Sequence, residues 1–387
     1  MAAVMAGVRL HGGAATRIQL QRSAQALRVT ALTADAAFTL PALWLRERAG
    51  SADQLDAVTR QRLVNPHDFP DDLSVVDAEL SETDVLLRFS DGYAGRYAIA
   101  ALLAELNAPP LLPGKLEWRA DLQPLPYCHW SALTESTALL QAVTTYLQHG
   151  FLIVRDTPVK PDSIRGIAAR FGVIRRTNFG EYFEVYSRPG SNDLAYRTVA
   201  LGPHIDNPYR TPTPGIQLLH CLCNETSGGE STLVDALHCG RQLRERDPQA
   251  FDLLARVPVR FCFDDDATSL AADRTLLDCD HTGQLQGIHY SPRLDWLPLM
   301  DEDTTRRYQH ARKQLSGLLC DPANELRLRL EPGDCLIMDN NRVLHGRTEY
   351  DPAEGTRHLQ GCYIDRDGPA SLYRRLSAAA ATAGDNG

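Results

Sequence analysis

Short runs of alternating apolar and polar residues dominate the first third of the chain. Residues 26–43 alternate as strands do, and residues 85–89 give a second strand signal. That signal ends at the dipeptide Asp91-Gly92 and resumes near Tyr97, which is typical of a hairpin. The segment 108–114 (APPLLPG) then breaks all periodicity. The pattern predicts a disordered leader over residues 1–15 and a small β-rich N-terminal domain over residues 16–115.

Two helical patterns with a strand between them follow this boundary. Leucine and valine recur on one helical face over residues 131–149, and Gly150 stands where a helix commonly ends. Residues 151–154 read as a buried strand, and residues 161–171 as a second helix that ends at Gly172.

The remainder of the chain consists mainly of short apolar runs separated by Gly, Pro and Asn. A helical stretch at residues 301–319 interrupts them. The runs are 216–222, 231–234, 257–263, 326–330, 335–338 and 358–364. Many strands with few helices between them favour a β-sandwich or jelly roll over alternating βαβ units. We therefore expect a mainly β protein with flanking helices, whose jelly-roll domain spans residues 116–387.

Composition narrows the class of protein. The 387 residues are 43% hydrophobic and 23% charged, with a formal net charge of −9. An acidic chain is a poor general ligand for nucleic acid, and no run approaches the roughly 18 apolar residues of a membrane-spanning helix. We expect neither nucleic acid nor membrane as a partner. The nine cysteines include no Cys-x-x-Cys pair and read as reduced thiols of a cytoplasmic protein.

A histidine and an aspartate two residues apart give the first candidate for chemistry. On a strand edge, His204 and Asp206 point to the same side and can occupy adjacent positions on one metal ion. His-x-Asp also arises by chance, so a third ligand is needed. His345 supplies one, because it follows the turn 331–334 (EPGD) and the apolar strand 335–338. Two histidines and one carboxylate form the facial triad of non-haem iron sites.

An arginine follows the distal histidine at a suggestive distance. Arg357 lies twelve residues beyond His345. A guanidinium fork is the natural partner for a carboxylate that is held at one end while its other end chelates a metal ion.

The combination resembles the Fe(II)/2-oxoglutarate dioxygenases. His-x-Asp, a long interval of short strands, Pro-Gly-Asp, His-Gly-Arg and a later arginine occur here in that order. Further segments are similar to the γ-butyrobetaine and trimethyllysine dioxygenase family and extend the resemblance over most of the chain. They are 43–47 (LWLRE), 227–235 (SGGESTLVD), 247–251 (DPQAF) and 357–363 (RHLQGCY).

The resemblance implies a fold, an activity and a set of site residues. The fold is a double-stranded β-helix, and the activity is hydroxylation with Fe(II), 2-oxoglutarate and O2, which releases succinate and CO2. The implied iron ligands are His204, Asp206 and His345, and the implied anchor for the distal carboxylate of 2-oxoglutarate is Arg357. Ser231 is a weaker candidate for binding the co-substrate. The resemblance is also compatible with ascorbate as a reductant for the enzyme and with a chain that forms a homodimer.

The N-terminal domain departs from the family pattern. Family members usually carry a structural zinc held by three cysteines and a histidine. Here residues 49–53 (AGSAD) contain no cysteine, and Tyr93 follows Ser90-Asp91-Gly92 in place of the histidine. Without thiolates we predict no zinc site.

The family's substrates carry a trimethylammonium group, which aromatic ring faces attract. By alignment with the family motif, the expected cage residues are Phe179, Phe183, Tyr196 and Tyr363, and Tyr209 lies just beyond the metal ligands. These rings could also be ordinary core aromatics, most readily Phe179 and Phe183.

The other end of such a substrate is an anion. Asp193 stands where an asparagine would face a carboxylate, and this disfavours γ-butyrobetaine. The chain offers Asn207, Ser291 and Arg293 instead, and a guanidinium suits a dianionic head group. The run 206–210 (DNPYR) also resembles the branch that acts on (2-trimethylammonioethyl)phosphonate. We favour this substrate and retain γ-butyrobetaine as the alternative; Arg293 could also be a plain surface arginine.

Two other classes of function compete with this interpretation. A hydrolase would need an activated nucleophile, and Ser231 lies in no Gly-x-Ser-x-Gly elbow. A metal-binding protein of cupin type, without catalysis, would share the triad. It would have no use for a carboxylate anchor such as Arg357.

Overall fold

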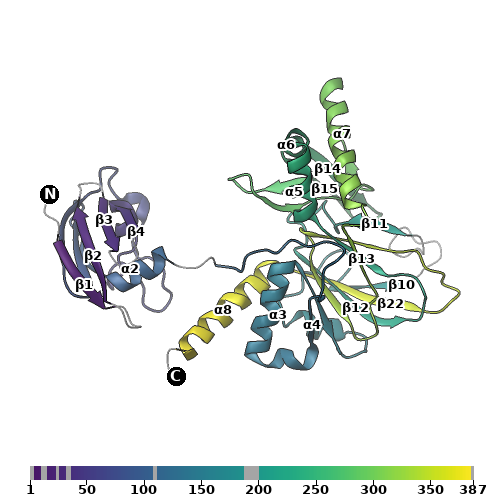
Figure 1. Ribbon diagram of the computed structural model, residues 1–387, viewed down its shortest axis with the longest axis horizontal. Coiled ribbons are helices and arrows are strands. Elements are labelled where there is room, and N and C mark those ends of the chain that lie inside the picture. Colours follow the sequence, from purple (N-terminus) through teal and green to yellow (C-terminus); the bar gives the residue numbers. More distant parts are fainter. Residues whose placement is uncertain are drawn as a thin grey trace. The chain divides into compact units, whose positions relative to one another are not determined.

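The computed structural model describes residues 4–9, 15–22, 26–31, 36–107, 111–186 and 200–384. The chain divides into two compact units, Met1–Pro109 and Pro110–Gly387, which are described separately (Figure 1). No helix among the described residues has the length and apolar character needed to cross a membrane.

The first unit contains a four-stranded meander and a three-stranded antiparallel sheet with short helices. Its elements are β1 (Val4–Arg9), β2 (Ala15–Arg22), β3 (Ala26–Ala31), β4 (Ala36–Pro41), α1 (Ala42–Arg46), η1 (Pro66–Asp68), β5 (Val75–Leu80), β6 (Asp84–Phe89), β7 (Ala94–Ala98) and α2 (Ile99–Leu106). Leu45, Leu87, Phe89 and Ile99 are among the buried residues of its core.

The predicted hairpin of this unit is confirmed, whereas the predicted leader is corrected. Strands β6 and β7 pair antiparallel around Gly92, whose φ of 87° favours glycine. Within the expected disordered leader, residues 4–9 instead form β1 and pair with β2. Six residues without sustained alternation give no strand signal of their own, and the pairing with β2 is what orders them.

One buried arginine, Arg46, is at the centre of the contacts in the first unit. The Arg46 guanidinium donates to Asp91 at 2.7 Å and to Gln54 at 2.8 Å. It also lies over the rings of Phe69 and Tyr93, at 4.5 and 4.1 Å from their centroids. A buried cation, its carboxylate and two ring faces thus link the strands and turns of this unit.

The second unit is built on two facing sheets. The larger has the strand order β10-β22-β12-β20-β9-β8 and the smaller β11-β21-β13-β19. All pairs are antiparallel except β8 with β9. Side chains from both sheets meet in one core, which includes Phe151, Leu233, Met338, Val343 and Leu359. This arrangement confirms the predicted jelly roll.

The strands of the second unit are β8 (Tyr127–His129), β9 (Phe151–Arg155), β10 (Tyr182–Tyr186), β11 (Leu201–His204), β12 (Ile216–Asn224), β13 (Ser231–Asp235), β14 (Pro258–Asp264), β15 (Ser269–Thr275), β16 (Leu277–Cys279), β17 (Leu285–Ile288), β18 (Asp295–Trp296), β19 (Glu325–Leu328), β20 (Cys335–Asp339), β21 (Val343–Arg347) and β22 (Arg357–Ile364). The helices are η2 (Trp130–Thr134), α3 (Ser136–His149), α4 (Ser163–Ala168), α5 (Ala236–Arg246), α6 (Pro248–Arg256), α7 (Glu302–Leu319) and α8 (Asp367–Gly384).

Helices cover the sheets in two groups. Helices α3 and α4 pack on the outer face of the larger sheet through residues such as Val143 and Ile164, and α8 lies alongside α3 (Figure 1). Helices α5, α6 and α7 pack with the small β14-β15-β18 sheet in a separate core. The predicted helix end at Gly150 is confirmed, because this residue is left-handed with φ 77°. Both α5 and α6 were missed, although Asp235 and Asp247 cap their N-termini.

Candidate functional site

Two neighbouring strands of the smaller sheet bring the predicted histidines together. His204 ends β11 and stands directly opposite His345 of β21 in the antiparallel register. Opposite residues in an antiparallel pair project from the same face, and the two ring centroids are 4.4 Å apart. Asp206 follows β11 by two residues, so residues distant in the sequence meet at one point.

The three side chains converge through one atom each. Asp206 Oδ1 lies 3.6 Å from His204 Nε2 and 3.7 Å from His345 Nε2. Within the part of the chain that the structure describes, this is the only group of three or more His, Cys, Asp or Glu side chains whose ligand atoms all lie within 4.8 Å of one another. The group can therefore hold a metal ion.

Both imidazoles present the nitrogen that a metal ion requires. His204 Nδ1 donates to the carbonyl of Gly202 at 2.9 Å, which leaves the Nε2 lone pair toward Asp206. Burial and the neighbouring His204 lower the pKa of His345 to about 4, so this ring is neutral near pH 7. The buried Nδ1 of His345 has no hydrogen-bond partner among the described residues.

The carboxylate of Asp206 is held by its second oxygen. Oδ2 accepts hydrogen bonds from Gln217 Nε2 at 2.6 Å and from the Tyr363 hydroxyl at 2.7 Å. Burial alone would raise the pKa of Asp206, but His345, His204 and the Tyr363 hydroxyl hold that pKa well below its ordinary value. An ionised carboxylate oxygen beside two imidazole nitrogens is a donor set that suits Fe(II), so the residues fit this metal.

The backbone at Asp206 is fixed as well. The Asp206 amide donates to Asn340 Oδ1 at 2.8 Å, and Asn340 Nδ2 donates to the Asp206 carbonyl at 2.9 Å. Asn340 is fully buried just before β21, so it ties the loop of the carboxylate to the strand of His345.

A cavity of about 90 Å³ between the two sheets contains the triad. Residues of both sheets line it: Phe183, Val185, Leu201, His204, Asp206, Gln217, Leu219, Ser231, His345, Gly346, Arg347, Arg357 and Leu359. The structure thus brings the predicted Arg357 and Ser231 into the same cavity as the triad.

Arg357 is a buried cation on the wall of this cavity. Only 7% of the residue is exposed, and its Nε donates to the Gly229 carbonyl at 3.2 Å. Burial, and after it the charge of Arg347, lowers the pKa of Arg357 to about 10, so the guanidinium is still charged near pH 7. Two guanidinium groups that line the same cavity, those of Arg347 and Arg357, favour an anionic ligand there.

The Gly-Gly turn before Ser231 makes room for this arginine. Gly229 has φ +72°, and a Cβ placed on it would lie 2.9 Å from both Cδ and Nε of Arg357. Because real side chains do not approach so closely, a larger residue here would displace the guanidinium or distort the turn.

Aromatic rings extend from the cavity wall. Phe183 lines the cavity, and its ring centroid lies 5.4 Å from that of Tyr363 and 6.5 Å from that of Phe179. Tyr209 is buried and donates to Asn207 Oδ1 at 2.6 Å. Phe263 of β14 stacks on Tyr209 at 5.0 Å and contacts Phe179 at 5.9 Å.

The predicted cage residue Tyr196 and the neighbouring Asp193 lie outside the described residues.

The predicted anion-binding residues lie beside the loop of the triad. The Ile205 amide donates to the Tyr290 carbonyl at 2.8 Å, which places the segment 289–293 next to this loop. Ser291 Oγ and Asn207 Nδ2 are buried and have no hydrogen-bond partner among the described residues. Arg293 is exposed, and its charge contributes to the lowered pKa of His345, after burial and His204.

Sequence reasoning missed four residues of this region. Gln217, Asn340 and Phe263 lie in ordinary strand or turn patterns, and only the fold shows what they contact. Arg347 was visible in the His-Gly-Arg motif, and its place in strand β21, two residues after His345, could have marked it as facing the same cavity.

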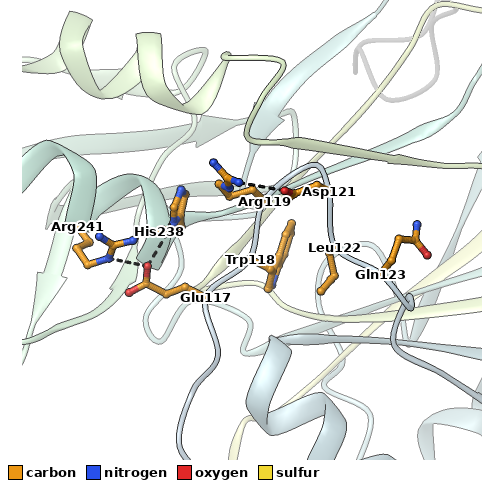
Figure 2. Close-up of a pocket in the computed structure, with 8 residues that line it drawn as sticks. All are labelled: Glu117, Trp118, Arg119, Asp121, Leu122, Gln123, His238 and Arg241. Carbon is orange, nitrogen blue, oxygen red and sulfur yellow. Dashed lines mark hydrogen bonds and ion pairs between the residues drawn. The ribbon is translucent and has the colours of Figure 1, made fainter.

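A second, larger groove shares no residue with this cavity. It measures about 430 Å³ and lies between α5 and residues 117–123 (Figure 2). Its charged groups pair with one another: Arg241 donates to Glu117 at 2.8 Å, and Arg119 to Asp121 at 3.0 Å. We therefore take the cavity between the sheets as the candidate site.

The chain is similar to several known proteins. The profile of the family described as "Taurine catabolism dioxygenase TauD, TfdA family" matches residues 110–363. Gamma-butyrobetaine dioxygenase of Pseudomonas sp. (strain AK-1) is 32% identical over 335 residues, which cover 84% of this chain and 87% of that protein. Trimethyllysine dioxygenase of Meyerozyma guilliermondii is 29% identical over 365 residues, covering 87% and 90%.

Among solved structures, a putative alpha-ketoglutarate-dependent taurine dioxygenase from Burkholderia xenovorans is similar. It has a TM-score of 0.48 and 12% identity, and the match covers 66% of this chain and 94% of that one.

Proposed function

Since the chain belongs to the TauD/TfdA family of dioxygenases, we propose that His204, Asp206 and His345 hold its Fe(II) and that Arg357 anchors its 2-oxoglutarate. The protein is a 2-oxoglutarate-dependent non-haem iron dioxygenase, related to the γ-butyrobetaine and trimethyllysine dioxygenases. Its cofactor is Fe(II) and its co-substrate is 2-oxoglutarate. The observation that carries the assignment of residues is the placement of the triad and a buried guanidinium on the walls of one cavity.

Each wall of the cavity has a distinct task in this proposal. Bound iron and 2-oxoglutarate supply the oxidising chemistry by which O2 hydroxylates a C–H bond, with succinate and CO2 as co-products. Arg357 binds the distal carboxylate, and Ser231 offers it a hydroxyl from strand β13 of the facing sheet. The side chains of Leu219 and Leu359 keep water from the co-substrate.

The cationic end of the substrate faces the aromatic rings. Ring faces attract a desolvated trimethylammonium group by about 0.5 to 2 kcal/mol each. Phe183 and Tyr363 are in mutual contact at the cavity, and Phe179 extends the apolar wall. Tyr196 stays a predicted further wall on sequence grounds alone, and Tyr209 supports the cage from behind through Phe263.

The anionic end of the substrate faces residues 207 and 291–293. A buried hydroxyl and a buried amide without partners among the described residues are costly, and a bound anion would satisfy both Ser291 Oγ and Asn207 Nδ2. Arg293 supplies the positive charge, since its field reaches His345. One guanidinium and two neutral donors suit a dianionic phosphonate, so (2-trimethylammonioethyl)phosphonate is the proposed substrate.

Succinate release tests this proposal. The protein with Fe(II) and 2-oxoglutarate is offered (2-trimethylammonioethyl)phosphonate, γ-butyrobetaine or trimethyllysine. We expect the phosphonate to stimulate turnover most, and Arg293→Gln to abolish this preference. Stimulation by the carboxylate compounds alone would refute the phosphonate assignment and favour γ-butyrobetaine hydroxylation. The observation that supports this alternative is the 32% identity to a gamma-butyrobetaine dioxygenase. No stimulation by any of the three would refute a trimethylammonium substrate.

A further inference from the structure

The two donors that hold Asp206 form a cross-strand pair. Gln217 of β12 and Tyr363 of β22 stand directly opposite each other in the antiparallel register of the larger sheet. The amide of one and the hydroxyl of the other both reach Asp206 Oδ2, at 2.6 and 2.7 Å. Asp206 itself follows β11 of the facing sheet, so this contact spans the interior of the jelly roll.

Two donors on a single oxygen fix the rotation of a carboxylate. With Oδ2 engaged by Gln217 and Tyr363, the free Oδ1 is turned toward the two imidazoles, at 3.6 and 3.7 Å from their Nε2 atoms. Without these donors the carboxylate could turn about its χ2 torsion, which is broad for aspartate. The pair therefore sets which oxygen is offered to a metal ion.

Tyr363 also belongs to the aromatic wall. Its ring contacts Phe183, with the two ring planes inclined by 35°, and Phe183 lines the same cavity. The hydroxyl and the ring of one side chain thus serve different neighbours: the hydroxyl contacts the carboxylate of the triad, and the ring contacts the apolar wall.

We propose that Gln217 and Tyr363 are positioning residues that orient the iron-binding carboxylate of Asp206, and that Tyr363 joins the metal site to the substrate cage through its two ends. The proposal rests on the proposed function, because it takes the triad as the iron site and the rings as the cage. Groups that orient metal ligands typically contribute about 10- to 100-fold to metal affinity.

Variants of Tyr363 distinguish the role of its hydroxyl at the metal site from the role of its ring in the substrate cage. Tyr363→Phe keeps the ring and removes the hydroxyl, so the dissociation constant for a metal ion should rise about 10- to 100-fold while the KM for substrate at saturating metal stays unchanged. Tyr363→Leu removes both ends and should raise both constants. Phe183→Leu should raise only the KM for substrate.

Gln217 offers an independent check on the same carboxylate oxygen. Gln217→Leu removes one donor without touching the rings, so it should weaken metal binding and leave the KM for substrate unchanged.

The matched control is Tyr308→Phe. Tyr308 is fully buried in α7, and its hydroxyl has no hydrogen-bond partner among the described residues. The same chemical change there should alter neither constant. Tyr363→Phe also loses a hydrogen bond to a charged carboxylate, so thermal unfolding without metal should show a lowered Tm, and the weaker metal binding should persist at temperatures well below that Tm.

The experiment is a calorimetric titration with Co(II) as the redox-stable probe, followed by succinate-release kinetics at saturating Fe(II) with (2-trimethylammonioethyl)phosphonate and with γ-butyrobetaine. Weaker Co(II) binding by Tyr363→Phe with an unchanged KM supports the proposal. Wild-type Co(II) affinity in Tyr363→Phe and Gln217→Leu overturns it and leaves the iron site intact. Wild-type affinity in His345→Ala refutes the proposed function instead.

Discussion

Replacing Arg357 should mainly weaken the binding of 2-oxoglutarate. Arg357→Met keeps most of the side-chain volume and removes a guanidinium that is buried, charged and only 7% exposed. Removing one partner of a buried, hydrogen-bonded charge pair costs about 2 to 5 kcal/mol. At about 1.4 kcal/mol per tenfold change, the KM for 2-oxoglutarate should rise by about 30-fold to several thousand-fold.

Succinate release at increasing 2-oxoglutarate concentration measures this effect, and Co(II) affinity checks that the triad is intact. Gly229→Ala offers a matched perturbation, because it retains the charge and pushes on Cδ and Nε of Arg357 from 2.9 Å. It should raise the same KM by a smaller factor. A KM for 2-oxoglutarate within about threefold of the wild type in Arg357→Met would refute the role of this arginine as the anchor.

Three further predictions concern stability. Arg342→Met leaves the buried carboxylate of Asp235 without its ion-pair partner, which lies 3.0 Å away in the wild type. The free energy of unfolding, measured in urea, should fall by about 3 to 5 kcal/mol, and a loss under about 1 kcal/mol would contradict this. Arg46→Met removes the charged hydrogen bond to Asp91 and should cost the N-terminal unit about 1.5 to 3 kcal/mol, which hydrogen exchange in that unit measures against unchanged exchange in the jelly roll. Burial lowers the pKa of His220 to about 4 from 6.5. The unfolded chain therefore takes up the proton first, and stability from this group, complete above pH 6.5, should fall by about 1.4 kcal/mol per pH unit toward pH 4. His220→Gln should flatten that slope, and an identical slope would exclude the assignment.

Local pattern was sufficient for most elements of the jelly roll. The strands β12, β13, β14, β19, β20 and β22 fall where short apolar runs are bounded by Gly, Pro and Asn, and the end of α3 follows from Gly150. Helices α5 and α6 were not predicted, because α5 follows β13 directly and α6 follows α5 directly. Their N-cap residues, Asp235 and Asp247, lie within segments that were interpreted only as family motifs. Strand β1 has no periodicity of its own and depends on pairing with β2.

Some residues of the site could be predicted from the sequence, and others could not. His204, Asp206 and His345 could be found because the metal demands these residue types and because strand geometry sets the His-x-Asp spacing. Gln217 and Asn340 could not, since an amide in a strand or turn carries no signal until the register shows what it contacts.

An anaerobic titration of the wild-type chain and of His345→Ala with Fe(II) tests the central claim most directly. If the two imidazoles and the carboxylate form the iron site, the wild type binds one Fe(II) per chain and the variant loses this binding. One tightly bound Fe(II) per chain in His345→Ala would show that iron binds elsewhere and would contradict the account.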